Sequence, residues 1–358
     1  MVSRRRRRPR RSPVGRWILL GLVAIVSGLM GTLSRVLQAD REAEWTVRAA
    51  DAVLSTPAAE GGCVYVGADD GLFYALEGAT GRLIWKFSRT YPFRADPLVA
   101  FGRVYVGCDD GHLYALESRT GREVWSVKAR GPVEWGPTLS GRTLYFADDG
   151  GVVRAVDALT GAPRWKYVSP AAIGRPVTVA GPQVFLVNRE GKAVALSAED
   201  GTLQWTADFQ GALLTQPVVA EGRVYIGLDS GEVYALSCHD GSRQRCYRAP
   251  GAVTARVATD GQRLYCGTAE GDLVAFHLAT GQLAWKYRAS GPFHAPPLIV
   301  DRTLYEGSID GYLYALDAAT GALRWRFYTG GEVTAGCTAD AHHLYFASWS
   351  GEIGAIRR

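Results

Sequence analysis

The sequence is poor in the patterns that build catalytic and metal sites. Its six cysteines never stand side by side, and its six histidines show no spacing typical of a zinc site. No Ser/His/Asp or Cys/His arrangement typical of nucleophilic catalysis can be recognised from spacing. Apolar residues at the 3.6-residue interval of an amphipathic helix are also missing from the body of the chain. These absences argue against a zinc enzyme, a hydrolase and a helical solenoid.

Positive charge is scarce outside the first residues, although the whole chain has a formal net charge of +5. Eight arginines and no acidic residue fall within residues 1–16. The remaining sequence holds 32 lysines and arginines against 35 aspartates and glutamates. A nucleic-acid-binding protein needs basic surface on its folded body, so the sequence argues against a nucleic-acid partner.

Long apolar runs are limited to one segment, residues 17–33 (WILLGLVAIVSGLMGTL). An arginine cluster before such a run holds the N-terminus in the cytoplasm. We therefore predict a basic cytoplasmic tail over residues 1–16 and a transmembrane signal-anchor, formed by a hydrophobic helix, over residues 17–37. The run is short for a spanning helix, and residues 32–34 (TLS) offer a small-x-small cleavage site. A cleaved signal peptide is therefore the alternative.

Both interpretations of the N-terminal segment place residues 41–358 outside the cytoplasm. With an uncleaved anchor, the protein is a single-pass protein of the cell membrane with its folded body extracytoplasmic. With a cleaved signal, it is secreted or periplasmic. No cysteine follows the apolar run, which argues against a lipoprotein anchor.

The rest of the sequence repeats with a period of 40 residues. Glycine recurs at positions 71, 111, 151, 191, 231, 271, 311 and 351. Alanine follows four residues later in every repeat, and tryptophan recurs at positions 45, 85, 125, 165, 205, 285 and 325. Arg245 is the exception in the tryptophan series. A fixed period of 40 to 45 residues is typical of propeller blades.

Each repeat contains four predicted strands. In the first, a strand over residues 52–59 precedes CVYVG, LFYALE and RLIWKF, which are separated by turns that contain Gly71 and Gly81. Four strands per 40 residues predict an all-β, eight-bladed β-propeller over residues 41–358. Trp45 falls in phase before any inner strand, so residues 44–48 should complete the last blade, residues 332–356, by velcro closure.

The repeats VYVGADDGLFYALEGATGRLIW and LYEGSIDGYLYALDAATGALRW resemble the tryptophan-docking repeat of the pyrroloquinoline-quinone-like (PQQ-like) propellers. The resemblance spans residues 45–358. That family includes quinoprotein dehydrogenases, outer-membrane assembly factors of the BamB type and sensor domains of membrane kinases. The resemblance therefore implies the fold, and leaves the function open among these classes.

The chain departs from the quinoprotein enzymes that it resembles. Those enzymes hold their cofactor under a pair of adjacent cysteines and build the pocket with long insertions, and this sequence has neither. The acid pairs at 69–70, 109–110 and 148–149 fall in one inter-strand turn, where turn chemistry accounts for them. The sequence thus predicts no cofactor, no metal and no catalytic residue, and favours a protein that is not an enzyme.

Variable positions where the innermost strands begin form the candidate partner or ligand face, because loops there vary over a rigid ring. Two tryptophans on this face replace smaller or polar residues of other repeats, and exposed tryptophan is enriched at binding surfaces. A water-lined polar channel with satisfied side chains is the alternative. The candidate residues are Arg94, Asp96, Glu134, Trp135, Arg175, Gln216, Arg256, His294 and Trp349.

Two further irregularities call for a structural account. Cys238 and Cys246 flank the repeat that lacks its tryptophan, and a disulfide between them could replace the lost packing. A hairpin centred near Gly241 sets these cysteines about four residues out of register, so free thiols are the alternative. Glu306 occupies a position that is apolar in the other repeats, where it needs a partner or a raised pKa, unless a bulge turns it to solvent.

The leading hypothesis is a membrane-anchored extracytoplasmic scaffold that binds a protein or an envelope polymer, with BamB-like envelope assembly as its most specific form. A quinoprotein-type oxidoreductase and a ligand-sensing propeller are the alternatives. The predicted cytoplasmic tail is too short to hold a catalytic domain.

Overall fold

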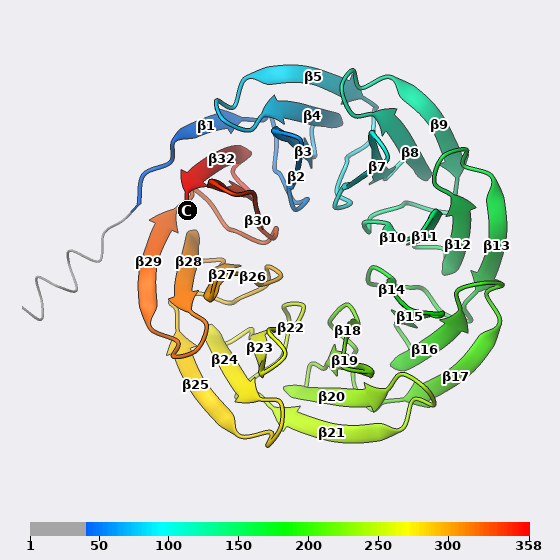
Figure 1. Cartoon of the computed structure of the whole chain (residues 1–358), viewed down its shortest axis with the longest axis vertical. Coiled ribbons are helices and arrows are strands. Elements are labelled where there is room, and N and C mark those ends of the chain that lie inside the picture. Colours follow the sequence, from blue (N-terminus) through cyan, green and yellow to red (C-terminus); the bar gives the residue numbers. More distant parts are fainter. Residues whose placement is uncertain (1–40) are drawn as a thin grey trace, which may run out of the picture. The chain divides into compact units, whose positions relative to one another are not determined.

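The computed structural model describes residues 41–358, which form eight four-stranded antiparallel sheets arranged around a central axis (Figure 1). The predicted all-β, eight-bladed propeller is confirmed. The predicted tail over 1–16 and the hydrophobic helix over 17–37 lie outside the described residues. Among residues 41–358 there is no apolar helix of membrane-spanning length.

The first four blades follow each other along the chain, from the innermost to the outermost strand. Blade one has β2 (Ala58–Glu60), β3 (Cys63–Gly67), β4 (Leu72–Glu77) and β5 (Leu83–Ser88). Blade two has β6 (Leu98–Ala100), β7 (Arg103–Cys108), β8 (His112–Glu117) and β9 (Glu123–Lys128). Blade three has β10 (Thr138–Ser140), β11 (Thr143–Ala147), β12 (Val152–Asp157) and β13 (Pro163–Val168). Blade four has β14 (Thr178–Ala180), β15 (Gln183–Val187), β16 (Lys192–Ser197) and β17 (Leu203–Asp208).

The last four blades have the same order. Blade five has β18 (Val218–Ala220), β19 (Arg223–Gly227), β20 (Glu232–Ser237) and β21 (Arg243–Arg248). Blade six has β22 (Ala258–Thr259), β23 (Arg263–Gly267), β24 (Asp272–His277) and β25 (Leu283–Arg288). Blade seven has β26 (Leu298–Val300), β27 (Thr303–Gly307), β28 (Tyr312–Asp317) and β29 (Leu323–Tyr328). Blade eight joins β30 (Thr338–Ala339), β31 (His343–Ala347) and β32 (Glu352–Arg357) to β1 (Trp45–Arg48).

The ring closes through the two ends of the described chain. Strand β1 pairs antiparallel with β32, in a register that sets Trp45 opposite Ala355. This is the pairing that other blades form between their third and outermost strands, such as Ala75 with Trp85. The predicted velcro closure is confirmed, and it leaves no blade without an outer strand.

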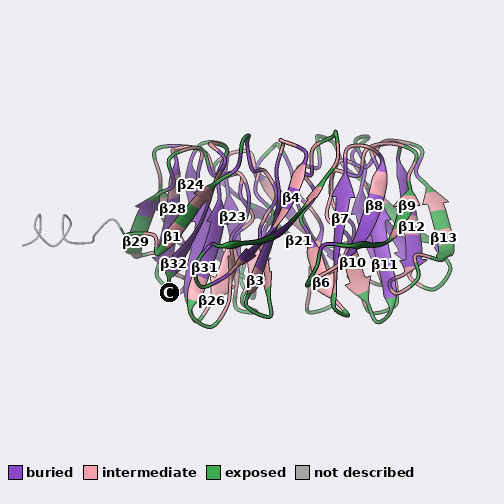
Figure 2. Cartoon of the chain, turned by 90° about the horizontal axis from the view of Figure 1, so that it is seen from above, coloured by how far each residue is buried: buried purple, intermediate pink, exposed green. Residues whose placement is uncertain are grey.

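Burial differs between inner and outer strands (Figure 2). The middle strands β3 and β11 are buried almost throughout, because neighbouring blades cover both of their faces. The outer strand β5 alternates, and Trp85 is its one fully buried residue. The apolar run of a middle strand and the alternation of an outer strand are thus two consequences of face-to-face blade packing.

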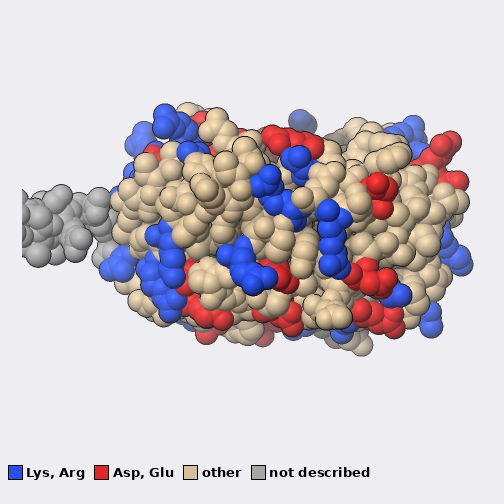
Figure 3. Space-filling view, turned by 90° about the horizontal axis from the view of Figure 1, so that it is seen from below, with Lys and Arg blue, Asp and Glu red and all other residues tan. Residues whose placement is uncertain are grey.

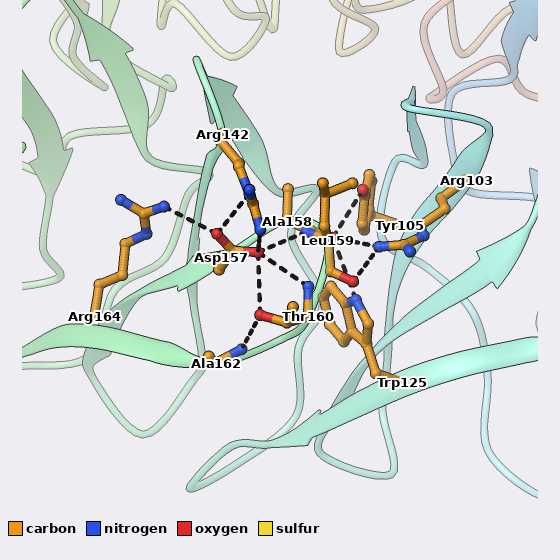
Figure 4. Close-up of polar contacts among 10 residues, drawn as sticks. All are labelled: Arg103, Tyr105, Trp125, Arg142, Asp157, Ala158, Leu159, Thr160, Ala162 and Arg164. Atoms are coloured by element: carbon orange, nitrogen blue, oxygen red, sulfur yellow. Dashed lines mark hydrogen bonds and ion pairs between the residues drawn. The ribbon is translucent and has the colours of Figure 1, made fainter.

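Each docking tryptophan reaches into the next blade. Trp125 Nε1 donates a hydrogen bond to the Ala158 carbonyl at 3.2 Å, and the Tyr105 hydroxyl donates to the same oxygen at 3.0 Å (Figure 4). The indole ring lies over Gly161, where a Cβ would stand 2.9 Å from the ring. Glycine at this position is therefore required by close packing as well as by its positive φ of 73°.

The turn that carries this carbonyl is held by Asp157. Its carboxylate accepts hydrogen bonds from the backbone N–H groups of Leu159 and Thr160, both at 3.0 Å. Arg142 and Arg164 form ion pairs with it at 2.8 and 3.0 Å (Figure 4). These contacts hold the pKa of Asp157 below its usual range, although burial acts in the opposite direction. The acceptor for the neighbouring tryptophan is thus fixed by the turn's own side chain.

The repeat without tryptophan uses a tyrosine instead. Tyr247 is buried, and its hydroxyl donates to the Leu278 carbonyl at 3.3 Å. That carbonyl occupies the repeat position of Ala158. Tyr225 occupies the repeat position of Tyr105, whose hydroxyl donates to the same carbonyl as a tryptophan. The Tyr225 hydroxyl itself has no hydrogen-bond partner among the described residues. Tyr247 therefore supplies the packing that the sequence analysis considered for a disulfide between Cys238 and Cys246.

The disulfide between Cys238 and Cys246 does not form in the structure, where both residues are free thiols. Cys246 pairs across β21 and β20 with Tyr234, four residues before Cys238. Cys238 lies in the turn beyond the end of β20, so the two Cβ atoms are held apart by strand register.

The outer side of the ring carries both signs of charge. In the view of Figure 3, lysine and arginine side chains are interspersed with acidic and uncharged ones. This side of the ring therefore has no continuous stripe of positive charge of the kind that follows a nucleic-acid backbone.

Candidate functional site

The candidate face predicted from the sequence forms one cavity on the propeller axis. The cavity has a volume of about 390 Å³. Every predicted face residue lines it, and they come from six connections between blades and from one turn within blade eight: Arg94, Asp96, Glu134, Trp135, Arg175, Gln216, Arg256, His294 and Trp349. The sequence therefore located the lining, although it could not show how the side chains pair.

One acidic residue of the lining was missed by the sequence analysis. Glu332 lines the cavity, and its carbonyl accepts a hydrogen bond from the Trp349 N–H at 2.8 Å. Its repeat position holds alanine or proline in the other repeats. That break in the pattern was a usable signal, of the same kind that singled out Trp135.

The inner end of the cavity is a ring of polar side chains. Asp96, Gln216 and Arg256 line both this cavity and a second one of about 790 Å³. Arg256 Nη1 donates to Gln216 Oε1 at 3.1 Å, and Asp96 Oδ1 accepts from the Thr56 N–H at 2.6 Å. Desolvation by the surrounding blades raises the pKa of Asp96 and lowers that of Arg256, and the charge of Asp96 partly offsets the lowering at Arg256. Both residues nevertheless keep exposed surface. These residues separate two polar cavities along the axis.

Arg94 is held by two aspartates of the inter-strand turns. Its Nε and Nη2 donate to the two oxygens of Asp69 at 3.0 and 2.9 Å, and its Nη1 donates to Asp109 Oδ2 at 3.1 Å. The prediction that turn chemistry accounts for the acid pairs is therefore incomplete. Asp70 and Asp110 do accept turn N–H groups, whereas Asp69 and Asp109 bridge adjacent blades through Arg94.

Negative charge accumulates beside Arg94. Burial raises the pKa of Asp109 to about 6, although Arg94 acts in the opposite direction. Burial and the charge of Asp149 raise the pKa of Glu134, which Arg94 and Arg189 lower. Asp109 and Asp149 each keep one buried carboxylate oxygen without a hydrogen-bond partner among the described residues. This side of the cavity is acidic and rich in acceptors.

The opposite charge is concentrated at Arg175. Its guanidinium carbon lies 5.4 Å from the ring centroid of Trp135, within cation–π distance, and its Nε donates to the Leu214 carbonyl. Burial, followed by the charge of Arg189, lowers the pKa of Arg175, although arginine remains charged at any physiological pH. Burial and Arg175 lower the pKa of His294, so its imidazole is neutral near pH 7.

Trp349 differs from Trp135 in exposure. It lies in the turn between β31 and β32 with 52% of its surface exposed, at the rim of the cavity. Trp135 is half-buried in the wall. The two tryptophans that break the repeat pattern thus belong to the same site but to different depths of it.

Glu306 lies outside this cavity, within the packing between blades. It is 1% exposed on β27, paired in register with Tyr314, and neither carboxylate oxygen has a hydrogen-bond partner among the described residues. The alternative of a bulge that turns it to solvent is wrong, because the ladder of β27 and β28 continues through it. Burial raises its pKa well above the usual range.

The lining of the cavity does not fit the quinone cofactor of the enzymes that the repeat resembles. None of the cysteines belongs to the lining. Within residues 41–358, no group of three or more His, Cys, Asp or Glu side chains has the arrangement of a metal site. The site is instead equipped for hydrogen bonding and charge recognition, with donors and acceptors on separate sides.

Comparison with known proteins agrees with this architecture. The profile of the family described as outer membrane protein assembly factor BamB matches residues 29–172, 149–250 and 245–357. Curated protein sequences give no match.

Among solved structures, BamB from Moraxella catarrhalis has a TM-score of 0.76 at 18% identity, covering 89% of this chain and 100% of that chain. The computationally designed Ika8 protein has a TM-score of 0.79 at 17% identity, covering 87% and 98%. Quinohemoprotein alcohol dehydrogenase from Comamonas testosteroni has a TM-score of 0.75 at 14% identity, covering 89% and 76%.

At these identities the structural matches bear on the fold alone, and they include an enzyme as well as an assembly factor. The profile match extends over nearly all of the propeller. The chain therefore belongs to the PQQ-like repeat β-propeller family described as outer membrane protein assembly factor BamB.

Proposed function

We propose that this protein is a non-enzymatic scaffold, anchored in the cell membrane by its N-terminal segment, whose extracytoplasmic propeller binds a protein or envelope-polymer partner. BamB-like work in envelope assembly is the most specific form of this proposal. The observation that carries it is the convergence of all the pattern-breaking face residues on one axial cavity. The blades otherwise repeat every 40 residues without insertions.

The chemistry of this cavity supports binding rather than catalysis. Arg94 of its lining is engaged in ion pairs with Asp69 and Asp109. The rim carries Trp349 in an exposed turn, and a large aromatic beside a polar pocket is a frequent anchor of protein interfaces.

Site-specific photo-crosslinking of the full chain in intact cells tests this proposal. A photoreactive amino acid at Trp349 should give a discrete adduct with an envelope component. The matched control is Leu203, which is 53% exposed against 52% for Trp349 but lies on the outer strand β17. Equal labelling from both positions, or none from Trp349, would refute a partner on the axial face.

A quinoprotein-type oxidoreductase and a ligand-sensing propeller are the alternatives. The structural match to quinohemoprotein alcohol dehydrogenase concerns the fold alone, and this chain covers 76% of that protein. Because the cavity lining contains no cysteine, we place the enzymatic alternative second. A sensing role would differ from the scaffold role in that the ligand changes the activity of another protein.

A further inference from the structure

Arg175 is the cation of the axial cavity that has no acidic partner. Arg94 is bound by two aspartates, and Arg256 lies within the electrostatic reach of Asp96. Among the described residues, Arg175 forms no ion pair, and its one hydrogen bond leads to the Leu214 carbonyl. A buried charge normally has a partner that repays part of its desolvation. The guanidinium therefore keeps unused donors inside the cavity.

A second donor without a partner belongs to the neighbouring indole ring of Trp135. Trp135 Nε1 is buried and has no acceptor among the described residues, unlike six docking tryptophans, each of which donates to a carbonyl of the next blade. The Arg175 guanidinium lies 5.4 Å from the centroid of the same indole. The indole N–H itself has almost no accessible surface, so the donors open to the cavity are those of Arg175, whose guanidinium lies against the Trp135 ring.

The charged groups around Arg175 indicate which kind of hydrogen-bond acceptor would bind to it. The charged neighbour that acts on Arg175 is Arg189, another cation, and His294 beside it is neutral near pH 7. The acidic groups of the cavity are oriented elsewhere: Glu134 interacts with Arg94 and Arg189, and Glu332 acts on His294. Arg189 forms an ion pair with Asp149 at 3.8 Å, so the positive charge that an anion would meet without a competing acid is that of Arg175 itself. A planar guanidinium matches a carboxylate in geometry, with two parallel N–H···O bonds.

The size of the site limits the ligand. A volume of about 390 Å³ is at the lower end of small-molecule pockets. It suits a chain end or a small acid rather than a folded segment. The inner end is bounded by the ring of Asp96, Gln216 and Arg256, which carries both signs of charge.

We propose that the axial cavity is a carboxylate-binding site, in which Arg175, lying against the Trp135 ring, holds the carboxylate of a peptide C-terminus or of a small organic acid. This inference deepens the proposed binding function and rests on it. It identifies the chemical group through which a partner or ligand enters the cavity.

Calorimetric titration of the full chain in detergent tests this site with three defined probes. N-acetyl-glycyl-phenylalanine carries the C-terminal carboxylate, its amide lacks the charge, and N-acetylglycine represents a small acid. The free dipeptide should bind saturably and the amide about 10-fold or more weakly, because charge-assisted bonds are roughly twice as strong as neutral ones. Equal binding of N-acetylglycine indicates a small-acid site, whereas binding of the dipeptide alone indicates a peptide C-terminus.

Two variants test the guanidinium. Arg175→Gln should weaken dipeptide binding about 10-fold or more. Arg175→Lys keeps the charge without the planar fork and should fall between wild type and Arg175→Gln. The matched control, Arg119→Gln, changes an exposed arginine after β8 and should bind as wild type.

Three outcomes would overturn the site: no saturable binding, equal affinity for acid and amide, or unchanged affinity in folded Arg175→Gln or Arg175→Lys. The crosslink from Trp349 is read separately. A persistent adduct together with any of these outcomes removes the carboxylate site and leaves the scaffold function standing. Loss of the adduct with intact dipeptide binding removes the scaffold and leaves a small-ligand site.

Discussion

Replacement of Glu306 by leucine should stabilise the propeller, and more so as the pH rises. The carboxyl group is 1% exposed and neither oxygen has a hydrogen-bond partner among the described residues. The same repeat position holds Leu186 in another blade, fully buried. Gly267 makes room for the side chain, since a Cβ there would lie 2.3 Å from Glu306 Oε1. Leucine is similar in volume, so the substitution exchanges polarity rather than size.

Two effects determine how much Glu306→Leu changes the free energy of unfolding. Burying a polar group without a hydrogen bond costs roughly 1–3 kcal/mol in mutational data, and leucine removes this cost at every pH. The second effect depends on protonation. Burial raises the pKa of Glu306, so the folded protein retains a proton that the unfolded chain releases above a pH of about 4.3. Between the unfolded and folded pKa values, wild-type stability falls by about 1.4 kcal/mol per pH unit.

The sign of this dependence distinguishes Glu306 from a salt-bridged acid. Its contribution to stability is most favourable below the unfolded pKa and is lost as the pH rises toward the folded pKa. The thiols of Cys266 and Cys337 interact with it electrostatically. Burial raises the pKa of Cys337 to about 12 and also raises that of Cys266, so both stay neutral between pH 5 and 7. The pH dependence of the difference between variants therefore belongs to Glu306.

Thermal unfolding of the full chain at pH 5 and pH 7 measures both effects. For a domain of this size, 1 kcal/mol shifts Tm by about 2 °C, so Glu306→Leu should raise Tm by roughly 2–6 °C at pH 5 and by more at pH 7. Glu306→Gln cannot ionise, and should show only the pH-dependent part of the gain. The control Glu199→Gln, in an exposed turn, should change neither value. A gain that is equal at both pH values, or a loss with leucine at pH 7, would refute the reasoning.

Four further predictions concern the tyrosine that replaces tryptophan, ring closure, topology and cofactor binding. Tyr247→Phe should lower stability by about 1 kcal/mol in thermal unfolding, whereas Tyr225→Phe, which removes a hydroxyl without a partner, should not; equal losses would contradict the assigned bond. Deletion of residues 41–50 removes β1 and should lower Tm by about 5 °C or more; an unchanged Tm would contradict the closure. A reporter fused after Arg358 should behave as exported in cells, and cytoplasmic activity would overturn the proposed topology. Pyrroloquinoline quinone with Ca²⁺ should leave Tm unchanged, and a shift of several degrees would favour the oxidoreductase.

The 40-residue period predicts the blades well because the residues that define it act within one repeat or between neighbours. Trp125 needs a carbonyl 33 residues away, and the same spacing recurs around the ring. Trp45, in phase but ahead of the first inner strand, was enough to predict how the ring closes. Eight of the nine face residues could be placed together because they precede the innermost strands, and Trp349 because its inter-strand turn belongs to the same face.

Side-chain pairing within the cavity was beyond the sequence, because it depends on distances across the axis and on rotamers. Asp69 resembled any turn aspartate, yet it accepts two hydrogen bonds from Arg94, 25 residues away on the next blade. Tyr247 had no distinguishing signal beyond its place near Arg245, since tyrosine and phenylalanine are common at its repeat position. Glu332 did break its pattern, and attention to all eight repeat positions would have found it.

The structure separates two uses of a residue that breaks the repeat. At Arg245 the break is compensated locally, because Tyr247 donates to the carbonyl that tryptophan serves elsewhere, and the fold continues unchanged. At Trp135 and Arg175 no such compensation exists within the described residues: the indole N–H has no acceptor, and the guanidinium forms no ion pair. A break that neighbouring residues compensate maintains the ring, whereas an uncompensated break at the axis is consistent with a partner outside the chain. On this criterion we propose the axial wall near Arg175, rather than Arg94 with its two aspartates, as the recognition site.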